Sequence, residues 1–203
     1  MAELARRSFN DAFWYAEEGY LYDVIDGEHR DVSLRPNQIL AVSLSHSMLD
    51  SGRARSVVAT VERELLTPRG LRSLATGDPR YRGRYLGDAV ARDMAYHQGT
   101  VWPWLLGPFF TAYLKIHDWD EASRANVQAW LEQFAEHLNE AGLGQVSEIF
   151  DGDAPLEPRG CIAQAWSVAE LLRVAVALAD FRLTTPGTRR SQAPVHKKAR
   201  AMG

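Results

Sequence analysis

The sequence lacks several features that would assign it to a common protein class. It holds one cysteine, Cys161, so an internal disulfide is excluded and a reducing, cytoplasmic setting is expected. No apolar run reaches the roughly 18 residues of a membrane span, and the charged segment 1–11 lacks the apolar core of a signal peptide. The formal net charge of −3 favours neither a nucleic acid nor a membrane surface as a partner.

Motifs for metal, phosphate and nucleophile chemistry are also missing. The six histidines show no H-E-x-x-H spacing, and the chain contains no G-x-x-x-x-G-K-[ST] phosphate loop. Ser147 and Ser167 lie outside any G-x-S-x-G context, and Cys161 has no paired histidine signal. We therefore expect neither a metal nor a cofactor.

What the chain does contain is a globular composition rich in large aromatic residues. Of its 203 residues, 46% are hydrophobic, and they include six Trp and seven Tyr. Most such rings fill a core, but flat aromatic rings also pack against the apolar faces of sugars. Composition alone leaves both roles open.

Apolar periodicity predicts six helices and no convincing strand pair, which indicates an all-α fold. The predicted helices cover residues 2–15, 36–49, 52–66, 99–116, 120–141 and 161–182. Between them, 19–27 forms a turn-rich connection, and 68–98 and 142–160 form long loops. From residue 184 the chain becomes basic and aperiodic, which predicts a disordered tail over 184–203. A nucleic-acid-binding arm is the less favoured interpretation of that tail.

The predicted helices alternate between buried and amphipathic. Gln38, Gln98 and Gln164 each lie at or near the start of a buried helix, and amphipathic helices lie between. Inner helices covered on all sides and outer helices covered on one face are typical of an α/α toroid. Residues 1–183 would then form half of a six-pair ring. An α-solenoid of three helix pairs remains the alternative.

Polar residues cluster where the buried helices begin. The clusters comprise Arg35, Asn37 and Gln38, then His97, Gln98, Gly99 and Thr100, and finally Arg159, Cys161 and Gln164. If these helices run parallel, the clusters and the two long loops meet at one end, where free N–H groups suit a hydroxyl-rich or anionic ligand. The same residues could instead act as helix caps and buried hydrogen-bond partners.

The loop 148–157 concentrates acidic residues. Its carboxylates are Glu148, Asp151, Asp153 and Glu157. Their spacing does not fit the D-x-[DN]-x-[DN]-G register of a calcium loop. Glycoside hydrolysis needs two carboxyl groups, about 6.5–9.5 Å apart in an inverting enzyme, and this loop could supply the base. A solvated acidic loop is the alternative.

Five long strings, in this order and at this spacing, resemble the C-terminal glucosidase domain of glycogen debranching enzymes. They are YLYDVIDG (20–27), SLRPNQILAVSL (33–44), AYHQGTVWPWLLGPF (95–109), EAGLGQVSEIFDGDAP (140–155) and PRGCIAQAWSVAELLR (158–173). The resemblance covers about residues 8 to 182.

The resemblance implies the C-terminal half of an (α/α)6 barrel and inverting hydrolysis of α-1,6-linked glucose in a branched α-glucan. Glu148, in the string VSEIFDG, matches the general base. The family's general acid is an upstream aspartate that no position here matches, so the isolated chain is expected to be inactive. The implied glucose contacts are Arg35, Gln38, His97, Gln98, Thr100, Trp102, Trp104, Gln164 and Trp166.

Two hypotheses follow. In the first, the chain is the base-bearing half of an amylo-α-1,6-glucosidase, and its partner is a chain carrying the N-terminal half. In the second, it is a non-catalytic glycan-binding or assembly module left by truncation. Since six helices cannot close the ring, helices 36–49 and 99–116 are expected to expose apolar surface.

Overall fold

The computed structural model describes residues 1–184, and the predicted basic tail lies outside the described residues apart from Thr184. The α-helices are α1 (Ala2–Phe13), α2 (Leu40–Ser43), α3 (Ser51–Leu65), α4 (Ala89–Ala95), α5 (Leu106–Ile116), α6 (Glu121–Ala135) and α7 (Ala165–Thr184). Short 3₁₀ turns are η1 (Pro36–Ile39), η2 (Pro103–Leu105) and η3 (Glu136–Asn139). The strands are β1 (Trp14–Tyr15), β2 (Tyr20–Leu21), β3 (Val24–Asp26), β4 (His29–Asp31), β5 (Leu66–Thr67), β6 (Gly70–Arg72), β7 (Val101–Trp102), β8 (Ile149–Phe150) and β9 (Pro158–Arg159).

Helix α5 is the centre of the fold. Its sequence is apolar on nearly every side, and α2, α3, α6 and α7 all pack against it. Phe109 and Phe110 are fully buried, and Trp130 of α6 stacks on Phe110 with ring centroids 5.6 Å apart. The expectation that 99–116 exposes apolar surface is therefore wrong, because neighbouring helices cover α5 on all sides.

Helices α3 and α6 are amphipathic and lie outside the central helices, as the sequence predicts. Each begins at an aspartate that caps it. Asp50 accepts hydrogen bonds from the Gly52 and Arg53 amides, both at 2.9 Å, and Asp120 accepts one from Ser123 at 2.7 Å. The apolar stripe of α3 includes Val57, Val61 and Leu65, all fully buried.

The predicted helix 36–49 is much shorter than expected. It consists of η1 and one turn of α2, and Leu44 is already extended. The Lys115 ammonium group of α5 donates to the Val42, Ser43 and Leu44 carbonyls at 3.2, 2.7 and 2.5 Å. These contacts satisfy the carbonyl groups at the end of α2, so a tertiary contact ends the helix where periodicity would extend it.

Small sheets correct the all-α prediction. One antiparallel sheet has the order β5-β6-β7-β8-β9, and two hairpins, β1-β2 and β3-β4, lie near the N-terminus. These strands are two or three residues long, too short to show a period of two in the sequence. Helix α4 likewise forms inside the predicted loop 68–98, with Asp88 accepting from the Ala91 amide at 2.9 Å.

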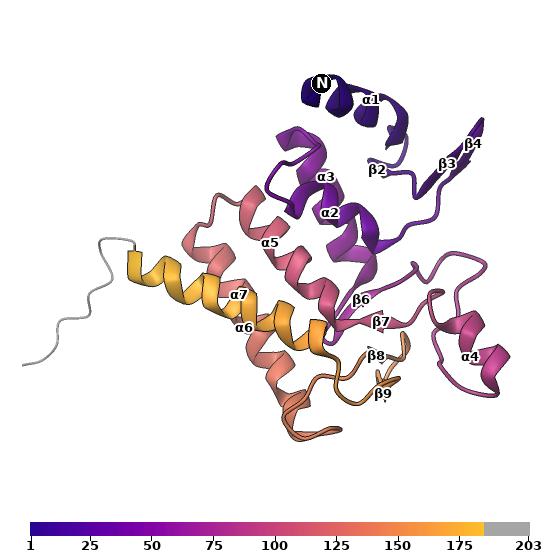
Figure 1. Cartoon of the computed structure of the whole chain (residues 1–203), viewed down its shortest axis with the longest axis vertical. Coiled ribbons are helices and arrows are strands. Elements are labelled where there is room, and N and C mark those ends of the chain that lie inside the picture. The colour runs from indigo at the N-terminus through magenta and orange to yellow at the C-terminus, as the bar shows by residue number, and fades with distance from the viewer. Residues whose placement is uncertain (185–203) are drawn as a thin grey trace, which may run out of the picture.

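The five-stranded sheet lies at the end of the molecule where η1–α2, η2–α5 and α7 begin (Figure 1). The two long loops meet at this end, since the Gly152 amide donates to the Gly83 carbonyl at 2.7 Å. The polar clusters at the starts of the buried helices are thus brought to one end, as predicted. Among the described residues, no helix is both long and apolar enough to cross a membrane.

Candidate functional site

Glu148 lies immediately before β8, and three donors from distant parts of the chain hold its side chain. Its Oε1 accepts from the Tyr96 hydroxyl at 2.5 Å and from Gln164 Nε2 at 3.3 Å. Its Oε2 accepts from the Cys161 amide at 2.9 Å. Because donors contact both of its oxygens, the carboxylate of Glu148 is held in one orientation.

Backbone pairing fixes the segments that carry these groups. The Glu148 amide donates to the Cys161 carbonyl at 2.8 Å, and the Gln164 amide donates to the Val146 carbonyl at 2.9 Å. Gly160, between β9 and Cys161, has a φ of +66° in the left-handed region. A Cβ atom at this position would lie 2.5 Å from Glu148 Oε2, so glycine allows both the turn and the close approach.

Tyr96 connects Glu148 to a group of aromatic rings. Its ring lies 4.9 Å from that of Trp102 and 4.8 Å from that of His97, both edge to face. Burial and the hydrogen bond to Glu148 raise the pKa of Tyr96 above its usual value. The phenol therefore stays protonated across the physiological range and acts as a donor to the carboxylate.

Beside these rings lies a concavity of about 520 Å³. Its lining includes Arg35, Asn37, His97, Gln98, Trp102, Trp104, Trp166, Asp23 and Asp31. The His97 and Trp102 rings stack with centroids 5.2 Å apart and planes 6° from parallel, and Trp166 lies 5.8 Å from Trp104. Glu148 is not among the lining residues, but Tyr96 touches both Glu148 and the aromatic wall.

A family model described as amylo-alpha-1,6-glucosidase matches residues 1–173. The chain belongs to this family. It is also 26% identical, over 163 residues, to the glycogen debranching enzyme of Saccharomyces cerevisiae. That match covers 71% of this chain but 11% of the relative, so the chain spans about a tenth of the relative's length.

In this amylo-alpha-1,6-glucosidase family member, Arg35 lines the concavity and joins three segments of the chain. Its guanidinium group donates to the Ser73 and His97 carbonyls at 3.0 and 2.7 Å and to Gln98 Oε1 at 2.9 Å. It also forms an ion pair of 3.3 Å with Asp23. Arg35 and Gln98 line the concavity but bind each other, so they shape it as much as they offer donors to a ligand.

Two predicted contact residues face inward. Gln38 is buried; its Oε1 accepts from the Leu21 amide at 3.2 Å and its Nε2 donates to the Arg35 carbonyl at 3.0 Å. Thr100 is fully buried; its Oγ1 donates to the Tyr96 carbonyl at 2.6 Å and accepts from Trp102 Nε1 at 3.2 Å. In this structure their side chains support the backbone of the site, because their polar atoms are already bonded within the protein.

The other predicted residues divide between the concavity and the carboxylate. His97, Trp102, Trp104 and Trp166 line the concavity, whereas Gln164 binds Glu148. Burial and the nearby Arg35 lower the pKa of His97, which favours a neutral imidazole at neutral pH. A neutral imidazole can both donate and accept a hydrogen bond, as a sugar hydroxyl requires.

The rest of the acidic loop holds the site together. Asp151 is fully buried and accepts from Arg159 at 3.0 Å and from the Tyr85 amide at 2.8 Å. Asp153 accepts from the Tyr81 hydroxyl at 2.9 Å. These contacts tie the acidic loop to the segment 81–85, so both aspartates have a structural role.

Sequence reasoning missed Tyr96, Asp23 and Asp31. Tyr96 directly precedes His97 in the string AYHQG. Its hydrogen bond to Glu148 depends on how the fold places the segment before β8, so the sequence alone does not reveal it. Asp23 belongs to the string YLYDVIDG, but nothing in that string marks it as a lining residue, and Asp31 ends β4 outside the five strings. In the described part of the chain, no group of three or more His, Cys, Asp or Glu side chains could hold a metal ion.

Proposed function

We propose that this chain is the base-bearing part of a glucosidase domain that removes α-1,6-linked glucose from branched α-glucan. The observation that carries the proposal is the Glu148 carboxylate, held by three donors and linked through Tyr96 to an aromatic concavity. Trp102, Trp104 and Trp166 supply flat rings for a glucose unit, and His97 supplies a hydrogen-bonding group.

In the proposed step, Glu148 takes a proton from a water molecule. The water oxygen bonds to the anomeric carbon as the bond from that carbon to the 6-oxygen of the next glucose breaks. The 6-oxygen leaves with the electron pair and receives a proton from a general acid. Attack from the opposite face inverts the anomeric configuration, and the two carboxyl groups then stand about 6.5–9.5 Å apart.

The general acid of this proposal comes from polypeptide outside these 203 residues. Two carboxylates line the concavity. Asp23 is paired with Arg35 at 3.3 Å, and Asp31 is paired with Arg80 at 3.6 Å. Hydrogen bonds from Ser33, together with Arg80, lower the pKa of Asp31. A general acid needs a raised pKa, so Asp31 does not suit the role, and Asp23 is already engaged in its ion pair with Arg35.

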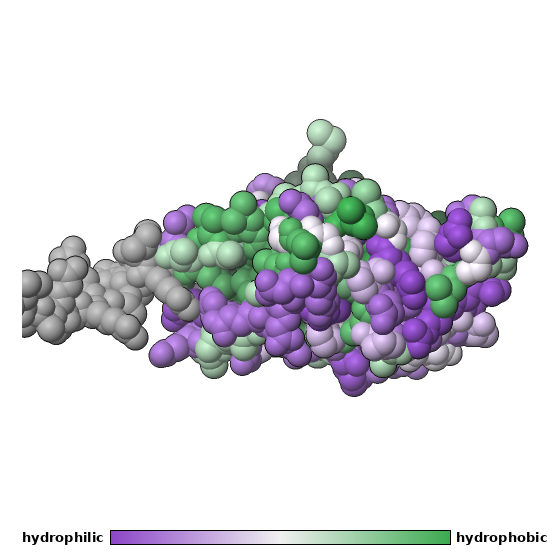
Figure 2. All heavy atoms as spheres, turned by 90° about the horizontal axis from the view of Figure 1, so that it is seen from below, coloured by the Kyte–Doolittle hydropathy of each residue, from purple (hydrophilic) through white to green (hydrophobic). Residues whose placement is uncertain are grey.

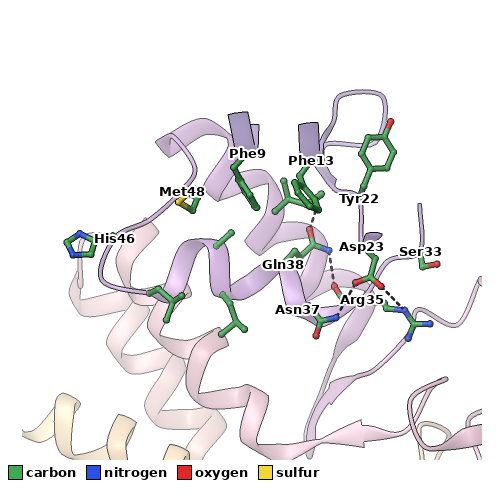
Figure 3. A pocket seen from close by; sticks show the side chains of 14 residues that line it. Phe9, Phe13, Tyr22, Asp23, Ser33, Arg35, Asn37, Gln38, His46 and Met48 are labelled. Carbon is green, nitrogen blue, oxygen red and sulfur yellow. Dashed lines mark hydrogen bonds and ion pairs between the residues drawn. The ribbon is translucent and has the colours of Figure 1, made fainter. Parts of the chain in front are cut away.

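The same proposal accounts for two apolar surfaces as the edges of a half-toroid. One is a pocket of about 310 Å³ between α1 and α2, into which Phe9 and Phe13 point from α1, towards α2 and Met48 (Figure 3). The other is a groove of about 440 Å³ between α6 and α7, which includes Leu131, Leu171 and Leu172. Apolar side chains gather beside the point where the chain leaves α7 (Figure 2). With α2, α5 and α7 inside and α3 and α6 outside, the missing half of the ring would cover both surfaces.

The test measures glucose release from an α-1,6-branched dextrin. The chain alone should release none, and mixing it with a chain that carries the upstream half of the domain should give activity with inversion. In that mixture Glu148→Gln should lower kcat about 10²–10⁴-fold, because the amide cannot accept the proton. Glu157→Gln, an exposed residue of the same loop, is the matched control and should keep most activity.

The outcomes separate the alternatives. Full activity of the isolated chain would contradict the proposal that the general acid lies outside these 203 residues. Full activity of the mixture with Glu148→Gln would contradict the assignment of Glu148 as the general base. The second candidate function is a non-catalytic glycan-binding module. It is supported by the aromatic concavity, whose lining carboxylates do not suit the role of general acid. It would be supported if the mixture stayed inactive while calorimetry with a branched dextrin showed binding that Trp166→Ala abolished.

A further inference from the structure

The two oxygens of Glu148 differ in how many of their acceptor positions are filled. A carboxylate oxygen offers two lone pairs. Oε1 receives both Tyr96 and Gln164, whereas Oε2 receives the Cys161 amide alone. One acceptor position therefore remains on Oε2. Gly160 and Cys161 next to it are exposed, and Glu148 itself is half-buried.

Tyr96 can keep Oε1 occupied because contacts on several sides hold Tyr96 itself in place. Its carbonyl accepts from Thr100 Oγ1 at 2.6 Å and from Trp102 Nε1 at 3.3 Å. Its ring packs between those of Tyr85, His97 and Trp102 at centroid distances of 5.7, 4.8 and 4.9 Å. Backbone hydrogen bonds and ring packing therefore hold the Tyr96 hydroxyl in place against Oε1.

We propose that Tyr96 is a positioning residue that, with Gln164, occupies Oε1 of Glu148 and so leaves Oε2 as the atom that accepts the proton of the attacking water. In the balanced step, the water O–H bond breaks, its proton bonds to Oε2, and its oxygen keeps the electron pair for the anomeric carbon. The inference rests on the proposed function for the reaction, but the geometry of Tyr96, Glu148 and Cys161 can be tested without it.

The first experiment needs no activity. Tyr96→Phe keeps the ring but removes the donor, so the carboxylate should rotate and release the Cys161 amide. Hydrogen exchange of that amide, followed by NMR in the 203-residue chain, should speed up about tenfold or more, since hydrogen bonds to charged groups are among the stronger ones. Tyr85→Phe, which alters a neighbouring ring, is the matched control and should leave the Cys161 amide unchanged. The Val174 amide in α7 reports whether each variant is folded.

The second experiment uses the chain mixed with the upstream half of the domain. Tyr96→Phe should lower kcat about tenfold or more with little change in KM, and the acidic limb of the pH profile of kcat/KM should move to higher pH. Tyr85→Phe should change neither kcat nor the pH profile. A purely structural role would reduce the amount of active protein without moving the pH profile.

The outcomes distinguish this inference from the proposed function. If Glu148→Gln abolishes activity but Tyr96→Phe matches Tyr85→Phe in exchange and in pH profile, the role of Tyr96 is wrong and the base assignment stands. If Glu148→Gln keeps full activity while Tyr96→Phe releases the Cys161 amide, Tyr96 does position Glu148, but the proposed role of Glu148 in the reaction is wrong. An unchanged Cys161 amide in a folded Tyr96→Phe chain overturns the inference in every case.

Discussion

Gly160 illustrates how much of this site depends on single residues. It has a φ of +66°, where an L-residue is strained, and a Cβ there would meet Glu148 Oε2 at 2.5 Å. Gly27, in the β3-β4 turn, has a similar φ of +57° but no atom within 4 Å of such a Cβ. The two glycines therefore separate backbone strain from collision with the carboxylate.

We predict that Gly160→Ala lowers activity of the complemented domain at least tenfold, because the new methyl group displaces Glu148. Gly27→Ala should cost a similar free energy of unfolding, about 1–2 kcal/mol, without loss of kcat. Urea unfolding and steady-state kinetics on both variants check this. Equal kinetic effects of the two substitutions would mean that backbone strain alone is responsible.

At the scale of elements, His137 connects the end of α6 to the segment that carries Glu148. It is fully buried in η3, and its Nε2 accepts from the Ser147 amide at 3.3 Å. Its Nδ1 lies 3.2 Å from Glu140, which also pairs with Arg69 at 2.8 Å. An Nε2 acceptor requires the neutral ring with its proton on Nδ1, so protonation of His137 would break the contact to Ser147.

We predict that His137 makes the domain sensitive to mild acid. Burial lowers the pKa of His137 despite the hydrogen bond to Glu140, so the folded state favours the neutral ring. The stability that this contributes is complete above the ordinary pKa of about 6.5 and is lost as the pH falls below it. The free energy of unfolding in urea should therefore drop between pH 7 and pH 5. Carboxylates with lowered pKa, such as Asp31 and Asp120, lose their contribution only nearer their ordinary pKa of 3.8.

His137→Asn should be less stable at pH 8 by about 1–2 kcal/mol and should show a smaller drop between pH 7 and pH 5. His97, whose pKa is also lowered, contributes to the drop that remains. His29→Asn, in the exposed strand β4, is the control and should keep the wild-type pH dependence. If the two variants show the same pH dependence, another group is responsible for the acid sensitivity.

At the scale of the whole molecule, the apolar surface lies at the two flanks and not at the centre. Helix α7 exposes Leu172 at 61% and Val176 at 49%, next to the groove that it forms with α6. In contrast, α5 is buried by four other helices. The chain thus has a complete core but exposes apolar flanks of the kind that usually bind another surface.

We predict that the isolated chain self-associates in a concentration-dependent way, measured by light scattering. The double substitution Leu172→Gln and Val176→Gln should reduce this association without lowering stability by more than about 1 kcal/mol, because both side chains are exposed. Leu143→Gln is the control: Leu143 is 77% exposed but lies in a loop outside the grooves. A wild-type chain that stays monomeric at all concentrations would contradict the assignment of the flanks.

The sequence by itself determined the helical layers and the identity of the family. Periodicity located α3, α5, α6 and α7, because a helix of several turns repeats its apolar positions often enough to be recognised. The long strings around Glu148, His97 and Trp166 led to the family that the comparisons support. Motif residues can be recognised without coordinates because the chemistry depends on their type and spacing along the chain.

Only the tertiary structure decided which of those residues face a ligand and which support the site. The five-stranded sheet joins two-residue strands from across the chain, and strands so short leave no periodic signal. The end of α2 depends on Lys115, more than 70 residues away along the chain. Gln38 and Thr100 turned inward, and Tyr96 reached Glu148, because hydrogen bonds between distant segments fixed their side chains. Such contacts depend on distances in space, which a single sequence does not encode in any local pattern.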